Sequence, residues 1–141
     1  MALLTLRLRR LRTFGWPSGK RVLDPFFYQA RGGQASNAVG GAVFVAGWYN
    51  LRNLETDEEK RIAGPWVNEP RDDKKIREVV NRAVAIFSDN DPFVIPENQK
   101  SWKERVGAKI IIEQNKGHFS GSDGITKLPS ALDSVLELAR K

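Results

Sequence analysis

Three short apolar runs occur along the chain from residue 39 onward, and each has the length of a buried strand. They cover residues 39–47, 83–87 and 108–113. Segments with apolar residues at helical spacing lie between and after them, at residues 72–80, 96–106 and 128–140. This alternation predicts an α/β fold in which parallel strands are joined by right-handed crossovers.

Local signals set the ends of the predicted helices. Pro96 suits a first helical turn, and Gly107 ends the same helix. Trp102 and Val106 lie one turn apart on it and are expected to face the sheet. The last helix is expected to begin near Pro129 and to bury an apolar stripe. That stripe consists of Leu128, Leu132, Val135, Leu136 and Ala139.

The first residues fit two templates. Leu4, Leu6 and Leu8 alternate as in a strand, whereas Leu4, Leu8 and Leu11 share one face of a helix. The stretch is rich in arginine and poor in serine. We expect it to be a poorly ordered basic tail.

Glycine and proline interrupt every periodic window of residues 14–37. We therefore divide the chain into two parts. Residues 1–36 are a basic segment of uncertain fold, and residues 37–141 are an α/β domain.

Charge is distributed unevenly along the 141 residues, which suffice for one domain with a single core. The net charge of +6 is confined to residues 1–36, which hold seven Lys or Arg and one acidic residue. Residues 37–141 hold equal numbers of basic and acidic residues. A nucleic-acid partner is therefore disfavoured for the α/β domain.

Two residue types exclude several kinds of site. The chain has no cysteine and one histidine, so disulfides, thiolate nucleophiles and multi-histidine metal sites are excluded. We expect neither a cofactor nor a metal. No apolar run approaches the ~20 residues of a membrane span, so we expect no membrane association and a cytoplasmic location. The arginine-rich start leaves mitochondrial targeting as a less favoured alternative.

Polar residues follow two of the predicted strands. The run at residues 83–87 ends in Ser-Asp-Asn-Asp, whose last residue is Asp91, and the run at residues 108–113 is followed by His118. Because the carboxyl ends of parallel strands meet at one edge of a sheet, we expect Asp91 and His118 to lie there together. An Asp and a His in this order are typical of the end of an α/β-hydrolase triad. Taken singly, each also fits a structural role, as an Asp-Pro turn and as a hydrogen-bonded loop histidine.

A resemblance to a known family rests on three stretches. They are Ser-Asp-Asn-Asp-Pro-Phe-Val-Ile-Pro at residues 88–96, the helix behind it, and Gly-His-Phe at residues 117–119. Together they closely resemble the C-terminal half of the small serine hydrolases of the retinoblastoma-binding-protein-nine type. The run at residues 39–47 resembles the strand that precedes that half. We find no likeness in residues 1–36.

The resemblance implies a three-layer, parallel-sheet α/β-hydrolase-like fold and hydrolysis of a small carboxylic ester or amide by a Ser-His-Asp mechanism. It assigns Asp91 as the triad acid and His118 as the triad base. Asp89 is the less favoured acid, because Asp91 stands directly before Pro-Phe-Val. Gly117 would let the histidine loop approach its neighbours closely.

The nucleophile of this family sits in a G-x-S-x-G elbow, on a tight turn from strand to helix. The chain contains no such motif. Ser18 has glycine at the wrong offset, and Ser36 precedes a strand instead of following one, so neither is a favoured nucleophile. We therefore expect a chain that lacks the elbow and the N-terminal strands and is weak or inactive alone. A truncated product, or an opening segment from another reading frame, would explain this.

The missing strands would also leave the strand at residues 39–47 with an unpaired apolar edge. In the resembled family that strand leads into a variable segment that covers the active site, and residues 51–70 fit such a segment. Trp48, Tyr49 and Trp66 would line an acyl pocket there, although packing of the segment onto the sheet is the favoured interpretation.

Two other functions stay open. One is a non-catalytic binding protein that uses an exposed sheet edge, or the segment between Trp48 and Trp66, to hold a protein partner. The other is a nucleic-acid binder that acts through its arginine-rich start. We favour this last function least, because the rest of the chain is electrically neutral.

Overall fold

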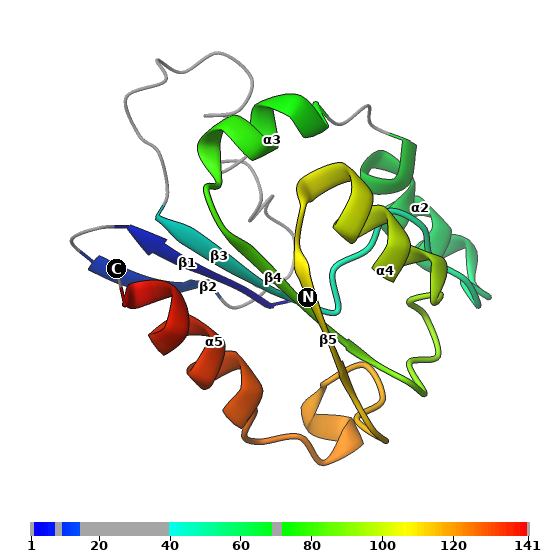
Figure 1. Cartoon of the computed structure of the whole chain (residues 1–141). Helices are drawn as coiled ribbons and strands as arrows, with labels where there is room; N and C mark the ends of the chain where they lie inside the picture. Colours follow the sequence, from blue (N-terminus) through cyan, green and yellow to red (C-terminus); the bar gives the residue numbers. More distant parts are fainter. Residues whose placement is uncertain (1, 8–9, 15–39, 69–71, 141) are drawn as a thin grey trace.

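The computed structural model describes residues 2–7, 10–14, 40–68 and 72–140. Five strands form one sheet in the order β2-β1-β3-β4-β5 (Figure 1). Their bounds are β1 Ala2–Arg7, β2 Arg10–Phe14, β3 Gly41–Val45, β4 Ala83–Ser88 and β5 Lys109–Glu113. The longer helices are α2 Asp57–Asn68, α3 Asp73–Val79, α4 Glu97–Ser101 and α5 Pro129–Ala139. A π-helical turn, η1 Trp102–Val106, continues α4, and η2 Gly121–Asp123 is a single 3-10 turn.

The three predicted strands pair in parallel, as the alternating pattern indicates. Val45 of β3 lies opposite Ile86 of β4, and Ile86 lies opposite Ile111 of β5. All residues of β3 and β4 are buried, which explains why both read as continuous apolar runs. The carboxyl ends of the three strands therefore meet at one edge of the sheet, and the candidate residues follow there.

The outer side of β3 is paired, so the expectation of an unpaired edge is wrong. β1 runs antiparallel to β3, from Ala2 opposite Val45 to Leu6 opposite Gly41. β2 in turn runs antiparallel to β1. Residues Ala2–Arg7 thus form a strand rather than a disordered tail, in line with the alternation of leucines. A buried strand needs partners for its N–H and C=O groups, and this hairpin supplies them on that side.

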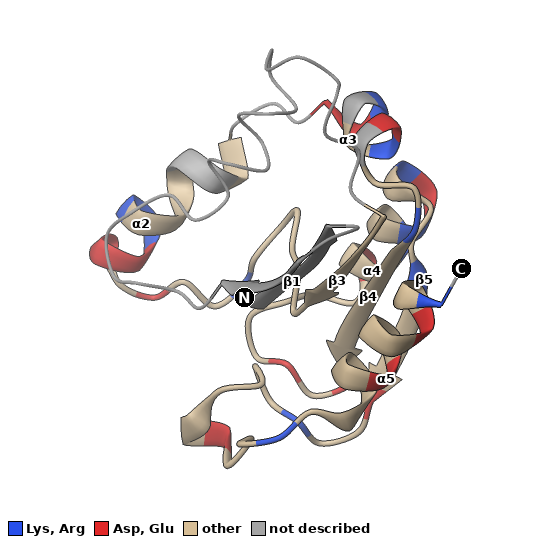
Figure 2. Cartoon of the chain, turned by 90° about the vertical axis from the view of Figure 1, so that its left-hand side faces the viewer, with Lys and Arg blue, Asp and Glu red and all other residues tan. Residues whose placement is uncertain are grey.

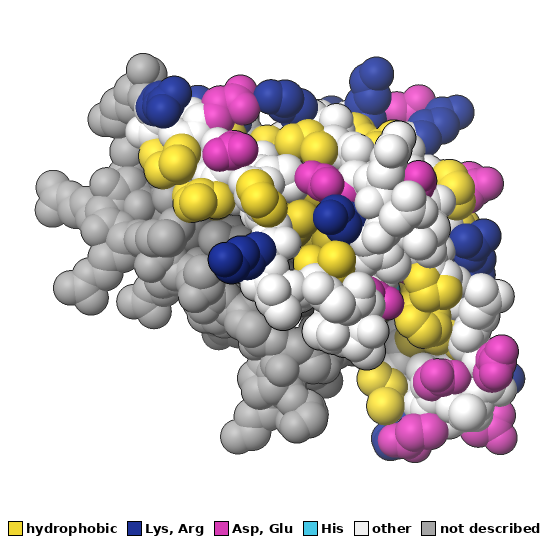
Figure 3. Space-filling view, turned by 90° about the horizontal axis from the view of Figure 1, so that it is seen from below, with side chains coloured by type: hydrophobic (Ala, Val, Ile, Leu, Met, Phe, Trp, Pro, Cys, Tyr) yellow, Lys and Arg dark blue, Asp and Glu magenta, His cyan; other side chains and the backbone are white. Residues whose placement is uncertain are grey.

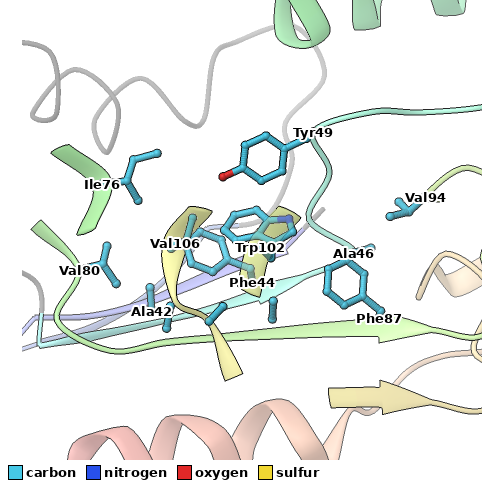
Figure 4. Packing of buried hydrophobic residues seen from close by; sticks show 13 residues of the cluster. Ala42, Phe44, Ala46, Tyr49, Ile76, Val80, Phe87, Val94, Trp102 and Val106 are labelled. Carbon is cyan, nitrogen blue, oxygen red and sulfur yellow. The ribbon is translucent and has the colours of Figure 1, made fainter. Parts of the chain in front are cut away.

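Helices cover both faces of the sheet, as expected for three layers (Figure 1). One face packs against α3, α4 and η1, where Trp102 lies between Phe44 and Tyr49 (Figure 4). The ring centroids of Trp102 lie 4.3 Å from Phe44 and 5.4 Å from Tyr49. Trp102 and Val106 are both buried, which confirms the predicted inner face of that helix.

A buried asparagine ties the end of β3 to the start of α4. Asn98 is 1% exposed, and its Oδ1 accepts from the N–H groups of Tyr49 (2.6 Å) and Asn50 (3.0 Å). Its Nδ2 donates to the carbonyls of Asn50 (2.8 Å) and Ile95 (3.0 Å). All four hydrogen-bonding positions of this amide are therefore used. They hold the segment after β3 against the start of α4.

The other face packs against α5, and the predicted stripe of this helix is wrong. Ala131 and Leu138 are buried although they lie outside the predicted stripe, and Ala139 is exposed although it lies within it. Val135 and Leu138 are buried against β3 and β4, whereas Leu132 is 59% and Leu136 47% exposed. α5 lies close to β3, because Gly41 has no side chain where Leu138 packs. A helix that contacts a sheet through one narrow stripe leaves its flank open. Seen from this side, hydrophobic patches are scattered between charged side chains (Figure 3).

The segment at residues 51–70 contains α2, a helix that the pattern of residues did not lead us to expect. A capping box begins it: the N–H of Glu59 donates to Thr56 Oγ1 (3.1 Å), and the N–H of Thr56 donates to Glu59 Oε2 (2.9 Å). Charged residues gather at its start (Figure 2). The Thr-x-x-Glu spacing was available in the sequence as a signal for this helix. No helix in the described part of the chain is long and apolar enough to cross a membrane.

Candidate active site

Asp91 lies three residues after the end of β4, at the carboxyl edge of the sheet, and is 3% exposed. Its Oδ1 accepts hydrogen bonds from the N–H groups of Phe93 (2.8 Å) and Val94 (3.0 Å). This is the local turn that an aspartate before a proline favours. Its Oδ2 lies 2.9 Å from Nδ1 of His118.

The surroundings of Asp91 keep it ionised. Burial raises the pKa of this carboxyl group, but the hydrogen bonds with His118, Val94 and Phe93 outweigh burial. The net result is a pKa below the ordinary value of 3.8. Asp91 is therefore a carboxylate at neutral pH, within contact of the imidazole.

The contact also determines the tautomer of His118. A carboxylate only accepts hydrogen bonds, so Nδ1 of His118 is the donor and Nε2 of the neutral ring has a free lone pair. The ring of Phe93 meets the imidazole edge-on, with centroids 5.4 Å apart. The His118 side chain is 26% exposed. An imidazole held in this way can take a proton at Nε2, and the carboxylate stabilises the cation that results.

The loop that leads to His118 is held by the residues just before Asp91. Three consecutive N–H groups of the loop donate to three consecutive side chains at the end of β4. These hydrogen bonds run from Asn115 to Asp89 Oδ1 (2.8 Å), from Lys116 to Ser88 Oγ (3.0 Å) and from Gly117 to Asn90 Oδ1 (2.8 Å). The Ser-Asp-Asn-Asp run therefore fixes the loop with its first three side chains and the imidazole with its fourth. Asp89 contacts Asn115 and not His118, in agreement with its lower rank as acid.

Asp123 holds the same loop from the other side. Its Oδ2 accepts from Ser120 Oγ (2.6 Å) and from the N–H groups of Ser120 (2.9 Å) and His118 (3.0 Å). The side chain and the N–H of Ser120, followed by the N–H of His118, lower the pKa of Asp123 below 3.8. Gly117 has a φ of +53°, and a Cβ on it would lie 2.5 Å from Asp123 Cγ. The predicted close approach at Gly117 is therefore confirmed, and Asp123 is what it approaches.

The backbone around Asp91 is held from the segment that follows β3. Arg52 Nη2 donates to the carbonyl of Asp91 (3.0 Å), and Arg52 Nε donates to the carbonyl of Pro92 (3.2 Å). Asn53 Nδ2 also donates to the carbonyl of Pro92, at 2.7 Å. The roles of these side chains were not predicted from the sequence, and neither was that of Asp123. Only Asp123 had a local signal, the Ser-x-x-Asp spacing of a capping box with Ser120.

The aromatic residues predicted to line an acyl pocket pack onto the sheet where the structure describes them. Tyr49 packs on Trp102 and donates to Asp73 Oδ1 (3.1 Å), and Trp48 packs against the same cluster, as the packing interpretation holds. The side chain of Trp66 and both Ser18 and Ser36 lie outside what the structure describes. Among the described residues, no hydroxyl is hydrogen-bonded to Nε2 of His118. Nor do three His, Asp or Glu side chains of that part converge as metal ligands would.

A family model described as Serine hydrolase matches residues 26–137, which is more than half of the chain. The chain belongs to the serine hydrolase family. This confirms the resemblance that Asp91, His118 and their neighbouring motifs indicated. The match begins at residue 26, so the expectation that residues 1–36 contain no likeness is wrong for the end of that segment.

A solved structure supports the fold of this member of the serine hydrolase family. The chain is similar to "The crystal structure of the ydeN gene product from B. subtilis", with a TM-score of 0.64 and 24% sequence identity. The match covers 75% of this chain and 54% of that chain, so the chain spans about half the length of that protein. At this identity the likeness shows the α/β-hydrolase fold alone. No curated protein matches the chain.

Proposed function

We propose that Asp91 and His118 are the acid and base of a Ser-His-Asp mechanism that hydrolyses a small carboxylic ester or amide. The observation that supports this most directly is the 2.9 Å contact between Asp91 Oδ2 and His118 Nδ1. Membership of the serine hydrolase family supports a role of this pair in hydrolysis. The lowered pKa of Asp91 suits a group that must stay ionised beside an imidazolium.

In this mechanism Nε2 of His118 takes the proton of a nucleophilic hydroxyl as its oxygen bonds to the substrate carbonyl carbon. Asp91 stabilises the imidazolium, which then gives the proton to the departing alcohol or amine. An acyl-enzyme remains. Water attacks it with the same help from His118, which releases the acid and restores the hydroxyl.

The nucleophile is the part of this mechanism that the described residues do not supply. No G-x-S-x-G motif occurs in the chain, and Ser18 and Ser36 lie outside the described residues. We therefore propose that the chain alone is a weak catalyst or inactive. An oxyanion hole would also need N–H groups next to the nucleophile.

Hydrolysis of a short-chain p-nitrophenyl ester tests the proposal. We expect slow hydrolysis by the folded wild-type chain and a fall of at least about a hundredfold in His118→Ala, because the proton acceptor is removed. Asp91→Asn should fall as well, whereas Asp133→Asn, on the exposed side of α5, is the control for loss of a carboxylate. A fluorophosphonate probe would report a reactive serine in the same samples. Absence of both hydrolysis and labelling in folded protein would contradict a catalytic role for the chain alone.

A non-catalytic interaction protein is the second candidate function. It is favoured by one observation: β5 has β4 as its single neighbour in the described sheet, and Ile112 on it is 53% exposed. Under this function the Asp91–His118 pair is retained as part of the scaffold.

A further inference from the structure

Among the described residues, no strand pairs with the outer edge of β5. Glu113 turns its carbonyl toward β4, because it accepts from the N–H of Asp89 (3.0 Å). Along a strand, successive residues turn their N–H and C=O groups to opposite sides. Ile110 and Ile112 therefore direct theirs away from β4, toward the free edge.

The sequence of this edge is complementary to itself. β5 reads Lys-Ile-Ile-Ile-Glu, with a positive charge at one end, a negative charge at the other and Ile111 in the middle. If a second copy pairs antiparallel about Ile111, each Lys109 lies opposite Glu113 of the other copy. Ile110 lies opposite Ile112 of the other copy, and these are the residues whose backbone groups are free. The pairing thus satisfies the edge backbone and the end charges at once.

Other registers do not satisfy the charges. A shift by two residues moves the two-fold axis to Ile110 or Ile112 and separates Lys109 from Glu113 of the other copy. A shift by one residue places each residue whose N–H and C=O groups point outward opposite a residue whose groups point toward β4, so the two strands cannot form hydrogen bonds. The register about Ile111 is the one that matches opposite charges across the two strands.

The side chains agree with this register. Ile110 packs with the cluster on the α4 side of the sheet, and Ile112, two residues on, faces the same side and is 53% exposed. Pairing would bring each exposed Ile112 against Ile110 of the other copy. Ile111 faces α5 instead and would meet its own counterpart on the axis. Lys109 also binds Glu137 of its own chain at 3.0 Å, so the new charge pair would extend an existing one.

We propose that the chain forms a two-fold symmetric dimer in which the β5 strands of two copies pair antiparallel about Ile111. Such an interface is isologous and closes on itself, joining the two sheets into one. A pair of five-residue strands is a small contact, so the association is weak and reversible. The proposal does not depend on catalysis.

Sedimentation velocity of the full chain at low ionic strength, over rising concentration, is the first measurement. We expect the mass to rise from 15.9 kDa toward twice that value. Lys109→Glu and Glu113→Lys each place like charges opposite one another at both ends, so each should weaken the dimer about tenfold. The double variant Lys109→Glu/Glu113→Lys restores opposite charges and should return to within about threefold of the wild type.

Three controls separate the edge from other effects. Asp133→Lys changes the net charge by the same amount as Glu113→Lys, on exposed α5, and should leave the dimer intact. Glu137→Gln removes the internal partner of Lys109 and should also leave it intact. Ile112→Pro removes an N–H that points outward, so it should block dimers without unpairing β5 from β4, whereas Ile112→Val should keep them.

A chain that stays monomeric at all concentrations would overturn the proposal. Lys109 and Glu113 would then be charged edge residues that disfavour pairing with another strand. A dimer that ignores the single reversals, or that the double reversal does not restore, would also overturn it, because the contact would lie elsewhere. Larger open assemblies would do the same, since a two-fold interface closes at two copies.

Discussion

At the scale of single residues, Asp91 shows how a nearly buried carboxylate is kept charged. Burial alone would favour the neutral form, yet Oδ1 accepts two backbone N–H groups and Oδ2 accepts from His118. Hydrogen bonds to a charged acceptor are stronger than those to a neutral one, so the ionised form is the stabilised one. The same bonds hold the imidazole in one orientation, with Nε2 outward from the carboxylate.

This arrangement predicts a pH-dependent contribution to stability. Because the pKa of Asp91 is lower in the folded chain than its ordinary 3.8, its contribution is present above about pH 4 and is lost as the pH falls through the folded pKa. We expect Asp91→Asn to lower the free energy of unfolding by about 1–3 kcal/mol at pH 7. The deficit should shrink steadily below about pH 4. Urea unfolding at several pH values measures it.

Asp133→Asn serves as the comparison for that experiment, because it removes a carboxylate from the exposed side of α5. A deficit for Asp91→Asn that is the same at pH 7 and at acid pH would show that the loss comes from altered packing and not from the charge.

At the scale of elements, the loop between β5 and η2 is built from side-chain bonds to its backbone. Its N–H groups from residue 115 to residue 118 all donate to side chains, of which three lie at the end of β4 and the fourth is Asp123. Positive φ angles occur at every second residue of this loop, at Asn115, Gly117 and Phe119. They change the direction in which successive backbone N–H groups point. A conformation of this kind persists only where its surroundings hold it, and here Asp123 and the Ser-Asp-Asn-Asp run do so.

Gly117→Ala should therefore loosen the loop. The new Cβ would meet the Asp123 carboxylate at 2.5 Å and would force a side chain into positive φ. We expect a loss of about 1–3 kcal/mol in the free energy of unfolding. Faster hydrogen exchange of the amides at residues 116–120 should accompany it.

Gly121→Ala, in the same loop region, is the matched control, since a Cβ there has no neighbour within 4 Å. Its stability and exchange should stay close to those of the wild type. If both alanine variants behave alike, the contact between Gly117 and Asp123 does not determine the loop.

At the scale of the whole molecule, the N-terminal hairpin closes one side of a parallel three-stranded sheet. β3 is buried throughout, and β1 pairs with it over five residues. Without β1 the N–H and C=O groups on that side of β3 would face water beside an apolar strand. At the opposite edge of the described sheet, β5 carries a charge at each end, and these are the charges of the proposed dimer contact.

Replacing residues 2–14 by a glycine-serine segment of equal length should expose β3. We expect a lower urea midpoint and a greater tendency to aggregate, because a buried strand becomes an edge. Unfolding curves and light scattering measure the two effects. Unchanged stability together with unchanged scattering would mean that the hairpin does not support β3.

Local pattern determined much of this protein. The apolar runs predicted β3, β4 and β5, and helical spacing with Pro and Gly signals predicted α3, the helix of Trp102 and α5, because these depend on neighbours within a few residues. The order of Asp91 and His118 along the chain, with the parallel topology, also predicted that they lie at one edge. The buried face of α5 escaped prediction because apolar residues repeat at helical spacing on two neighbouring faces of this helix. Packing against the sheet selects the face of Leu138 over that of Leu132 and Leu136.

Only the tertiary structure decided which partners complete each element. One example is the antiparallel pairing of β1 with β3. Others are the hydrogen bonds from the histidine loop to Ser88, Asp89 and Asn90, and the bond from the N–H of His118 to Asp123. A sequence pattern records which side of an element is apolar, and this needs no knowledge of the rest of the chain. Hydrogen-bond partners far apart in the chain depend on register and loop path, which are set when the whole sheet assembles.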